Sequence, residues 1–172
     1  MEALGVLDEL LPEFAAHLAI PERRAHWDLW VAGVDRLTAA HGPLPRDALF
    51  VLLWWPLMRA SLADQENPEA LDWGRYVAGA INGMAKRMGV PIRNRQWLRM
   101  TATMLRRMLH PPKRRKVGGR MLANPVLPLS LTILRLSFLC GLDTQEAYEA
   151  WASAAAEIGV WAAPFAPNAD EM

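Results

Sequence analysis

The chain has 172 residues, and its 19 basic and 18 acidic side chains leave a formal net charge of only +1 at pH 7. Apolar residues make up 52% of the chain, which excludes a largely disordered protein and allows one domain with a real hydrophobic core. A single cysteine excludes an internal disulfide and favours a reducing, cytoplasmic setting. No signal peptide is expected, and no apolar stretch reaches the length of about 20 residues that spans a bilayer.

The first half of the chain shows two strong helical signals. After Pro21, Trp27 and Trp30 begin a stripe of apolar residues at the spacing of one helix face. Residues 47–63 are apolar on all sides, which indicates a central, buried helix. Pro56 lies inside this segment and is expected to kink the helix, because proline lacks the backbone N–H donor.

The second half continues the helical pattern. An apolar stripe over residues 73–88 predicts a helix that ends at Gly89 and Pro91. Another helix follows Pro91, and residues 129–139 form a strongly apolar one before a last helix near the C-terminus. Strand-like alternation is missing throughout, so the sequence predicts an all-α fold of about seven or eight helices.

These signals predict one helical domain over residues 1–159. Proline and small residues dominate after it, so we expect residues 160–172 to form a flexible tail. The domain itself is long enough to bury its own core.

Basic residues are concentrated in one segment. Residues 1–85 carry 6 basic and 12 acidic side chains, a net charge of −6, whereas the segment 86–120 has twelve basic side chains and no acidic one. The twelve are Lys86, Arg87, Arg93, Arg95, Arg99, Arg106, Arg107, Lys113, Arg114, Arg115, Lys116 and Arg120. Because like charges repel, a polyanionic partner is the natural explanation, and all twelve are candidate contacts for it.

Helical geometry groups some of these side chains. A turn of about 100° per residue places Arg95, Arg99 and Arg106 within about 40° of one another on the helix after Pro91. The apolar side chains of this helix are expected on the opposite, core side: Trp97, Met100, Met104 and Met108. Residues 113–120 add a basic loop with two glycines, which we expect to move toward the arginine face.

Signs of catalysis are missing from the sequence. It has no glycine-rich phosphate loop, no histidines and cysteines at metal-ligand spacing, and no serine or cysteine beside a histidine and an acid. We therefore assign no catalytic residue and no metal ligand. The tryptophan and methionine stripes have the spacing of core residues, and Trp97 is the one aromatic residue of the basic segment, so no stacking platform for bases is expected.

Three segments give the chain a resemblance to a known family. Residues 49–57 read LFVLLWWPL, residues 88–93 read MGVPIR, and residues 120–125 read RMLANP before LRL at 134–136. In this order and spacing they resemble the C-terminal, RNA-binding region of bacterial poly(A) polymerase I, a relative of the CCA-adding tRNA nucleotidyltransferases. The resemblance covers almost the whole chain and implies an all-α domain that binds RNA.

Two departures from the family pattern matter. Asn124 stands where the family has histidine before proline, and the basic residues that follow in the family are replaced by Val126, Leu127 and Pro128. The Gly-Ser and Asp-x-Asp residues of the family's catalytic head are missing, so this chain has no ligands for two-metal nucleotidyl transfer. The resemblance therefore implies no cofactor here, and ATP and Mg²⁺ only together with a polynucleotide adenylyltransferase head in the same or another chain.

The function expected from the sequence is RNA binding for polyadenylation or related RNA processing, on the basic surface of residues 86–120 and without catalysis by this chain alone. Two other functions remain open. A regulatory or protein-interaction domain would use the same basic face for an acidic partner protein, and a helical DNA-binding domain would use it for duplex DNA. A membrane partner is not expected.

Overall fold

The computed structural model describes residues 9, 11–44, 46–65, 72–109, 119–142 and 144–157. The helices are α2 (Pro12–Leu18), α3 (Pro21–His41), α4 (Arg46–Ala63), α5 (Trp73–Arg87), α6 (Ile92–Met108), the four-residue α7 (Gly119–Leu122), α8 (Leu127–Leu139) and α9 (Gln145–Ala156). The described residues contain no strand, which confirms the predicted all-α fold of about seven or eight helices. None of these helices is long and apolar enough to cross a membrane. The expected tail and the boundary at residue 159 lie outside the described ranges.

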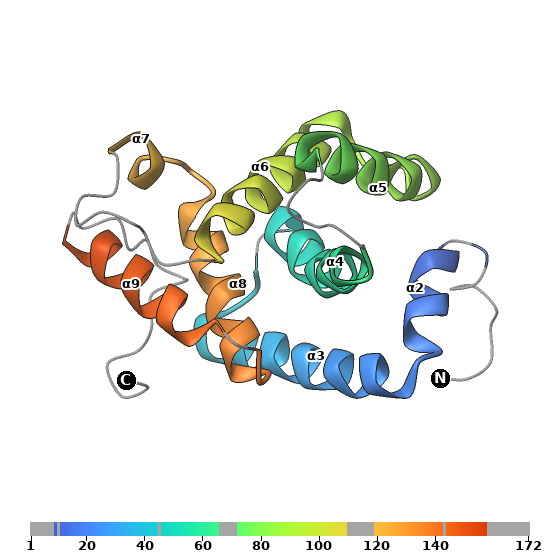
Figure 1. Ribbon diagram of the computed structural model, residues 1–172, viewed down its shortest axis with the longest axis horizontal. Helices are drawn as coiled ribbons and strands as arrows, with labels where there is room; N and C mark the ends of the chain where they lie inside the picture. Colours follow the sequence, from blue (N-terminus) through green and yellow to red (C-terminus); the bar gives the residue numbers. More distant parts are fainter. Residues whose placement is uncertain are drawn as a thin grey trace.

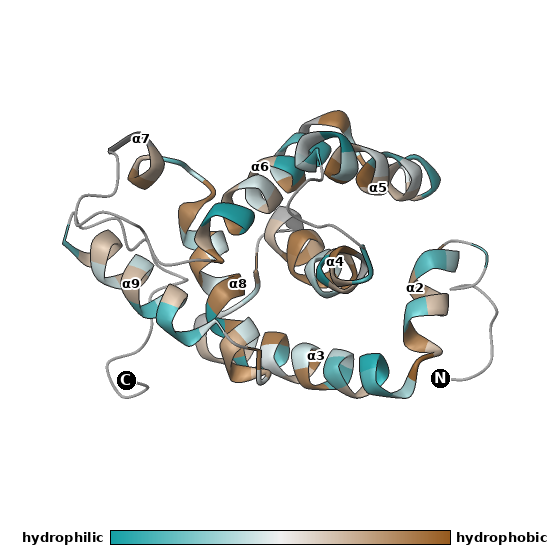
Figure 2. Cartoon of the chain, in the orientation of Figure 1, coloured by the Kyte–Doolittle hydropathy of each residue, from teal (hydrophilic) through white to brown (hydrophobic). Residues whose placement is uncertain are grey.

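Helix α4 lies at the centre of the fold. In Figure 1 it is seen nearly end-on, with α3 below it, α5 and α6 above it and α8 beside it. Helix α6 lies between α5 and α8, while α9 packs on the outer side of α8 and α2 rises from the start of α3. Figure 2 shows that α4 and α8 are the most hydrophobic helices, as expected for elements with neighbours on several sides.

The central helix continues through its proline. Pro56 has no N–H to donate, so the carbonyl of Leu52, four residues earlier, lacks its usual helical partner. The indole Nε1 of Trp30, a fully buried residue of α3, donates to this carbonyl at 2.8 Å. This bond satisfies the buried carbonyl and joins α3 to α4 at the same point.

Helices α3 and α8 approach each other closely at Gly33. A Cβ atom at this position would lie 3.0 Å from Cδ2 of the buried Leu136, closer than side chains normally pack. A larger residue would therefore need the Leu136 side chain to shift, so glycine suits the available space here rather than the backbone conformation. The close contact brings α8 against α3 on one side while α8 also contacts α6 on the other.

We predict that Trp30→Phe lowers the free energy of unfolding by about 2–3 kcal/mol, because it leaves the Leu52 carbonyl unpaired and removes buried volume. In a Pro56→Ala background the new backbone N–H of residue 56 can bond the carbonyl. The same Trp30 substitution should then cost about 1 kcal/mol less. Urea unfolding of the four proteins measures this coupling, and strictly additive effects would contradict the role given to Trp30.

Candidate nucleic-acid interface

The turn between α5 and α6 fixes the start of the basic helix. Gly89 has a positive φ of 62°, and the Val90 N–H reaches back to the Ala85 carbonyl at 2.8 Å, which closes the end of α5 in a Schellman motif. The Val90 carbonyl then accepts a hydrogen bond from Nε of Arg95 at 2.9 Å. The turn thus holds the half-buried Arg95 by its stem nitrogen and leaves its two terminal nitrogens for other partners.

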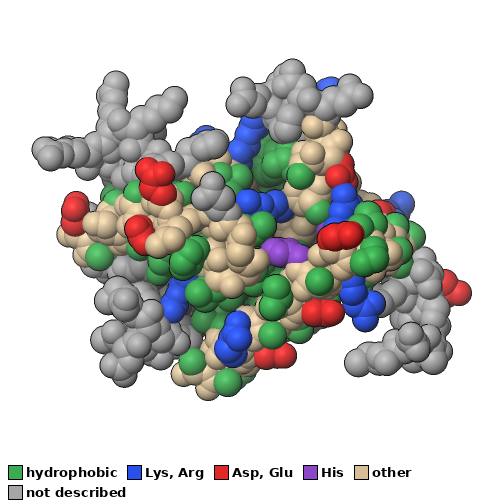
Figure 3. All heavy atoms as spheres, turned by 60° about the horizontal axis from the view of Figure 1, so that its bottom comes forward, with side chains coloured by type: hydrophobic (Ala, Val, Ile, Leu, Met, Phe, Trp, Pro, Cys, Tyr) green, Lys and Arg blue, Asp and Glu red, His purple; other side chains and the backbone are tan. Residues whose placement is uncertain are grey.

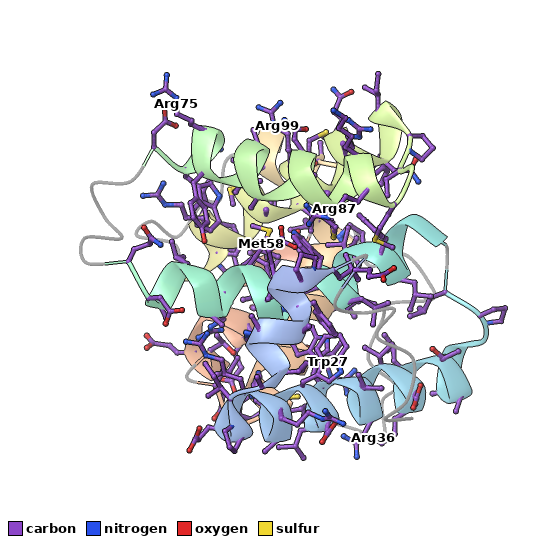
Figure 4. All side chains as sticks on the ribbon, turned by 90° about the vertical axis from the view of Figure 1, so that its right-hand side faces the viewer. Trp27, Arg36, Met58, Arg75, Arg87 and Arg99 are labelled. Carbon is purple, nitrogen blue, oxygen red and sulfur yellow. The ribbon has the colours of Figure 1, made fainter. Side chains whose placement is uncertain are left out.

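A groove of about 790 Å³ runs along the outer side of α6, and three arginines line it: Arg95, Arg99 and Arg107. Among the described residues no carboxylate forms an ion pair with any of the three. Figure 4 shows Arg99 projecting away from the helices at one end of the molecule. The groove therefore concentrates positive charge that no acidic side chain of the described residues neutralises.

The other residues of the groove are polar amides, one threonine and apolar side chains. The polar ones are Asn82, Gln96, Thr103 and Asn124. The apolar ones are Ile92, Met100, Met104 and Met121. None of these described lining residues is acidic or aromatic, so the groove offers cations, hydrogen-bonding amides and a flexible apolar floor.

Helix α6 is rotated relative to the sequence expectation. Its most buried side chains include Leu98 and Leu105. Measured around the helix from Arg95, these two leucines lie at about 300° and about 280°. Of the four expected core residues, Met104 and Met108 are buried, whereas Trp97 and Met100 are only half-buried against the core, and Met100 also lines the groove. The prediction that Arg106 lies opposite the core was therefore wrong: it is half-buried at the edge of the core, with its guanidinium carbon 5.4 Å from the centre of the Trp73 ring.

Trp73 is the reason for this rotation. It is buried at the start of α5, and its Nε1 donates to the Ala102 carbonyl of α6 at 3.2 Å. The indole therefore holds α6 by a carbonyl that lies four residues before Arg106, and the guanidinium packs over the same ring. The sequence pattern placed Trp73 in the core but did not show which face of α6 it would cover.

The two basic residues at the end of α5 differ in their surroundings. Nη2 of Arg87 donates to Oε1 of Glu13 at 2.6 Å, which joins α5 to α2. Figure 4 shows Arg87 beside α2, at a distance from Arg99 along the molecule. Lys86 is exposed. Neither residue lines the groove, and a polyanion would compete with Glu13 for Arg87.

Several predicted contact residues lie outside what the structure describes. Residues 113–116, which contain Lys113, Arg114, Arg115 and Lys116, are outside the described ranges. Arg93 lies in α6 and Arg120 in α7, but their side chains are not among the described ones. For these residues RNA contact remains a prediction from the sequence.

Sequence reasoning did not identify the amide residues of the groove. Asn82, Gln96 and Asn124 come from α5, α6 and the turn before α8, and no spacing in the sequence relates them. Asn124 was noticed only as a departure from a family pattern. Only the packing of α5 and α8 against α6 brings the three residues to one groove.

A second cavity of about 360 Å³ lies between α2, α4 and α5 and is lined in part by His17, Trp54 and Met58. Arg23 of α3 bonds Asp64 beside it at 2.6 Å. Burial lowers the pKa of His17 below its ordinary value of 6.5, and the positive charge of Arg23 lowers it further, while Asp64 acts in the opposite direction. His17 is therefore a neutral, buried histidine at neutral pH.

Other reactive groups do not gather into a site. The described residues contain no group of three His, Cys, Asp or Glu side chains that could hold a metal ion. Cys140 is buried, and burial raises the pKa of its thiol, so it stays protonated. The face of the molecule that includes α3 mixes acidic, basic and hydrophobic side chains, as Figure 3 shows. The groove along α6 is thus the strongest candidate site in the described part of the chain.

Comparisons with protein families, curated proteins and solved structures find no match for this chain. The structure itself shows a helical domain, all-α in its described residues, with an arginine-lined groove.

We predict that Arg106→Gln lowers the free energy of unfolding by about 0.5–1 kcal/mol, because it removes the cation from the Trp73 ring. Arg107→Gln is the matched control: the neighbouring arginine is exposed, so the same change should leave stability nearly unchanged. Chemical denaturation of both variants checks this. Equal effects of the two substitutions would mean that Arg106 gains nothing from the indole.

The lowered pKa of His17 predicts a loss of stability in acid. Above pH 6.5 the histidine is neutral in both folded and unfolded chains and contributes no pH dependence. As the pH falls below 6.5 the unfolded chain binds the proton first, so the free energy of unfolding decreases until the folded pKa is reached. His17→Gln should make this decrease shallower between about pH 7 and pH 5, as measured by urea unfolding at several pH values. An unchanged slope would contradict the prediction.

Proposed function

We propose that this domain binds RNA by its phosphate backbone in the groove along α6. The observation that carries the proposal is the set of three arginines, Arg95, Arg99 and Arg107, which line one groove without an ion-paired carboxylate among the described residues. Guanidinium groups bind phosphate oxygens with two parallel hydrogen bonds, and the phosphate replaces the missing counter-charge.

The spacing of the arginines suits an extended polyanion better than a single phosphate. With a rise of about 1.5 Å per residue, Arg95 and Arg99 are about 6 Å apart along the helix, and Arg107 lies about 12 Å beyond Arg99. The groove has no aromatic lining residue on which bases could stack. Contacts of this kind position a backbone and carry little sequence information, so we expect similar binding to unrelated RNA sequences.

The family resemblance supports the same proposal. The segment 88–93 forms the turn that begins α6, and the segment 120–125 supplies Met121 and Asn124 to the groove. The segment 49–57 lies in α4, which packs beneath α6. In this proposal the domain is cytoplasmic and holds RNA for a nucleotidyltransferase head resembling that of poly(A) polymerase. ATP and Mg²⁺ would then act at that head.

A second candidate function is supported by the apolar floor of the groove. Met100, Met104 and Met121 give a flexible hydrophobic surface between basic side chains. Such a surface also suits an acidic amphipathic helix of a partner protein, with its apolar face on the methionines and its carboxylates on the arginines. RNA is preferred because a nucleic-acid backbone carries a negative charge at every nucleotide along the length that the three arginines cover.

We predict that the chain binds single-stranded RNA with an affinity that falls on a log–log salt plot by about 0.7 for each phosphate contact. Three contacts from the groove arginines give a slope near −2, and the other basic residues of the segment 86–120 steepen it. Arg99→Glu/Arg107→Glu should weaken binding at least tenfold and reduce the slope by about 1.4. Fluorescence anisotropy with two unrelated labelled RNAs measures both quantities, and both RNAs should lose affinity by a similar factor.

The matched control is the double charge reversal Arg24→Glu/Arg36→Glu. Both arginines are exposed on α3, and Figure 4 shows Arg36 at the opposite end of the molecule from Arg99. This variant has the same net charge as the groove variant, so a purely global charge effect would weaken binding equally in both. Equal losses, or no RNA binding by the wild type at low salt, would overturn the proposal and favour the acidic protein partner.

A further inference from the structure

Asn124 is held rigidly at the edge of the groove. Its Oδ1 accepts the Val126 N–H at 3.1 Å, its carbonyl accepts the Leu127 N–H at 3.0 Å, and its own N–H donates to the Met121 carbonyl at 3.2 Å. The side-chain oxygen is therefore used within the turn that begins α8. The amide Nδ2, with two N–H donors, has no hydrogen-bond partner among the described residues.

The groove has two flanks, one on each side of a line along α6. Measured around α6 from Arg95, Arg99 lies at about 40°, toward α5, whereas Gln96 lies at about 100°, Arg107 at about 120° and Met100 at about 140°. Met100 and Met104 share the second flank with Met121, and Asn124 follows in the α7–α8 turn. A strand along α6 thus has Arg95, Arg99 and Asn82 on one side, and Gln96, Asn124 and Arg107 on the other.

We infer that two amides of the second flank, Asn124 and Gln96, recognise the ribose 2′-hydroxyl and make the site selective for RNA over DNA. The inference rests on the proposed function, because it requires a nucleic-acid backbone in the groove. Phosphates pair with Arg95 and Arg99, which turns the sugar between them toward these two amides. A neutral amide adds no charge for phosphates, but it donates and accepts hydrogen bonds, as the 2′-hydroxyl does.

The fixed position of Asn124 is what gives this contact selectivity. A donor on a mobile side chain would lose entropy on binding and would adapt to either sugar. Because Oδ1 is held by the Val126 N–H, the Nδ2 group keeps one direction, and deoxyribose leaves it without a partner at the sugar. An unpaired donor in a filled groove disfavours DNA as well as failing to attract it.

The test compares oligouridine RNA with oligodeoxyuridine DNA of the same length, so that the bases are identical. Wild-type protein should bind the RNA more tightly. Asn124→Ser keeps an oxygen that can accept from the Val126 N–H but removes the amide donors. It should weaken RNA binding by roughly three- to tenfold, the worth of one neutral hydrogen bond, and should not weaken DNA binding, because it removes the donor that deoxyribose leaves unpaired.

Gln96→Ala provides a second variant that does not depend on the α7–α8 turn. Gln96 is exposed on α6, and alanine favours the helix, so folding is preserved. It should also weaken binding to RNA more than to DNA. Arg99→Glu/Arg107→Glu is the contrasting variant, because phosphate contacts are common to both nucleic acids and both affinities should fall together.

The outcomes separate this inference from the proposed function. Equal wild-type affinity for the two oligonucleotides, or equal losses for RNA and DNA in Asn124→Ser and Gln96→Ala, would overturn hydroxyl recognition while backbone binding stands. A loss for Asn124→Ser that appears with oligouridine but not with oligoadenosine would overturn it in favour of base recognition. Binding to neither nucleic acid at low salt would overturn both proposals.

Discussion

The fold depends on the hydrogen bond from the Trp30 indole to the Leu52 carbonyl, which replaces the helical bond that Pro56 cannot make. Helix α4 contacts α3, α6 and α8, so the central position requires an unbroken helix. Pro56 removes a backbone donor from the middle of that helix, and the Trp30 indole supplies another to the Leu52 carbonyl. Because the Trp30 donor belongs to α3, the same hydrogen bond keeps α4 continuous and holds it against α3. A buried carbonyl without this partner would cost about 1–3 kcal/mol.

Helix α6 has to support a hydrophobic core and a row of like charges. Its inner face packs on α4, α5 and α8, while Arg95, Arg99 and Arg107 line the groove outside. Repulsion between the arginines weakens the helix, and packing on four neighbouring helices, α9 included, offsets it. Trp73 assists because it fixes the rotation of α6 through the Ala102 carbonyl. The core of this fold therefore determines which arginines reach the groove.

The helices, the central position of α4 and the basic character of α6 could all be predicted from the sequence, because apolar periodicity and charge are local properties. The rotation of α6 could not. Its apolar residues cover more than half the circumference, so periodicity alone allowed either Met100 or Leu98 to face the core. The contact between α5 and α6 through Trp73 decided between them. The amides of the groove could not be predicted either, because only tertiary packing brings Asn82 and Asn124 to the same groove.

The small net charge of +1 is a poor guide to how this protein would meet the polyanion proposed as its partner. At physiological salt a charge is screened over about 8–10 Å, so acidic residues farther from the groove scarcely weaken its field. They do act on an approaching strand, because the face that includes α3 mixes both signs of charge (Figure 3). A polyanion gains little from that face and much from the arginines of α6. Because the basic residues are concentrated in one segment, a polyanion would be attracted to one side of the folded domain. Basic residues spread evenly over the surface would not favour one side.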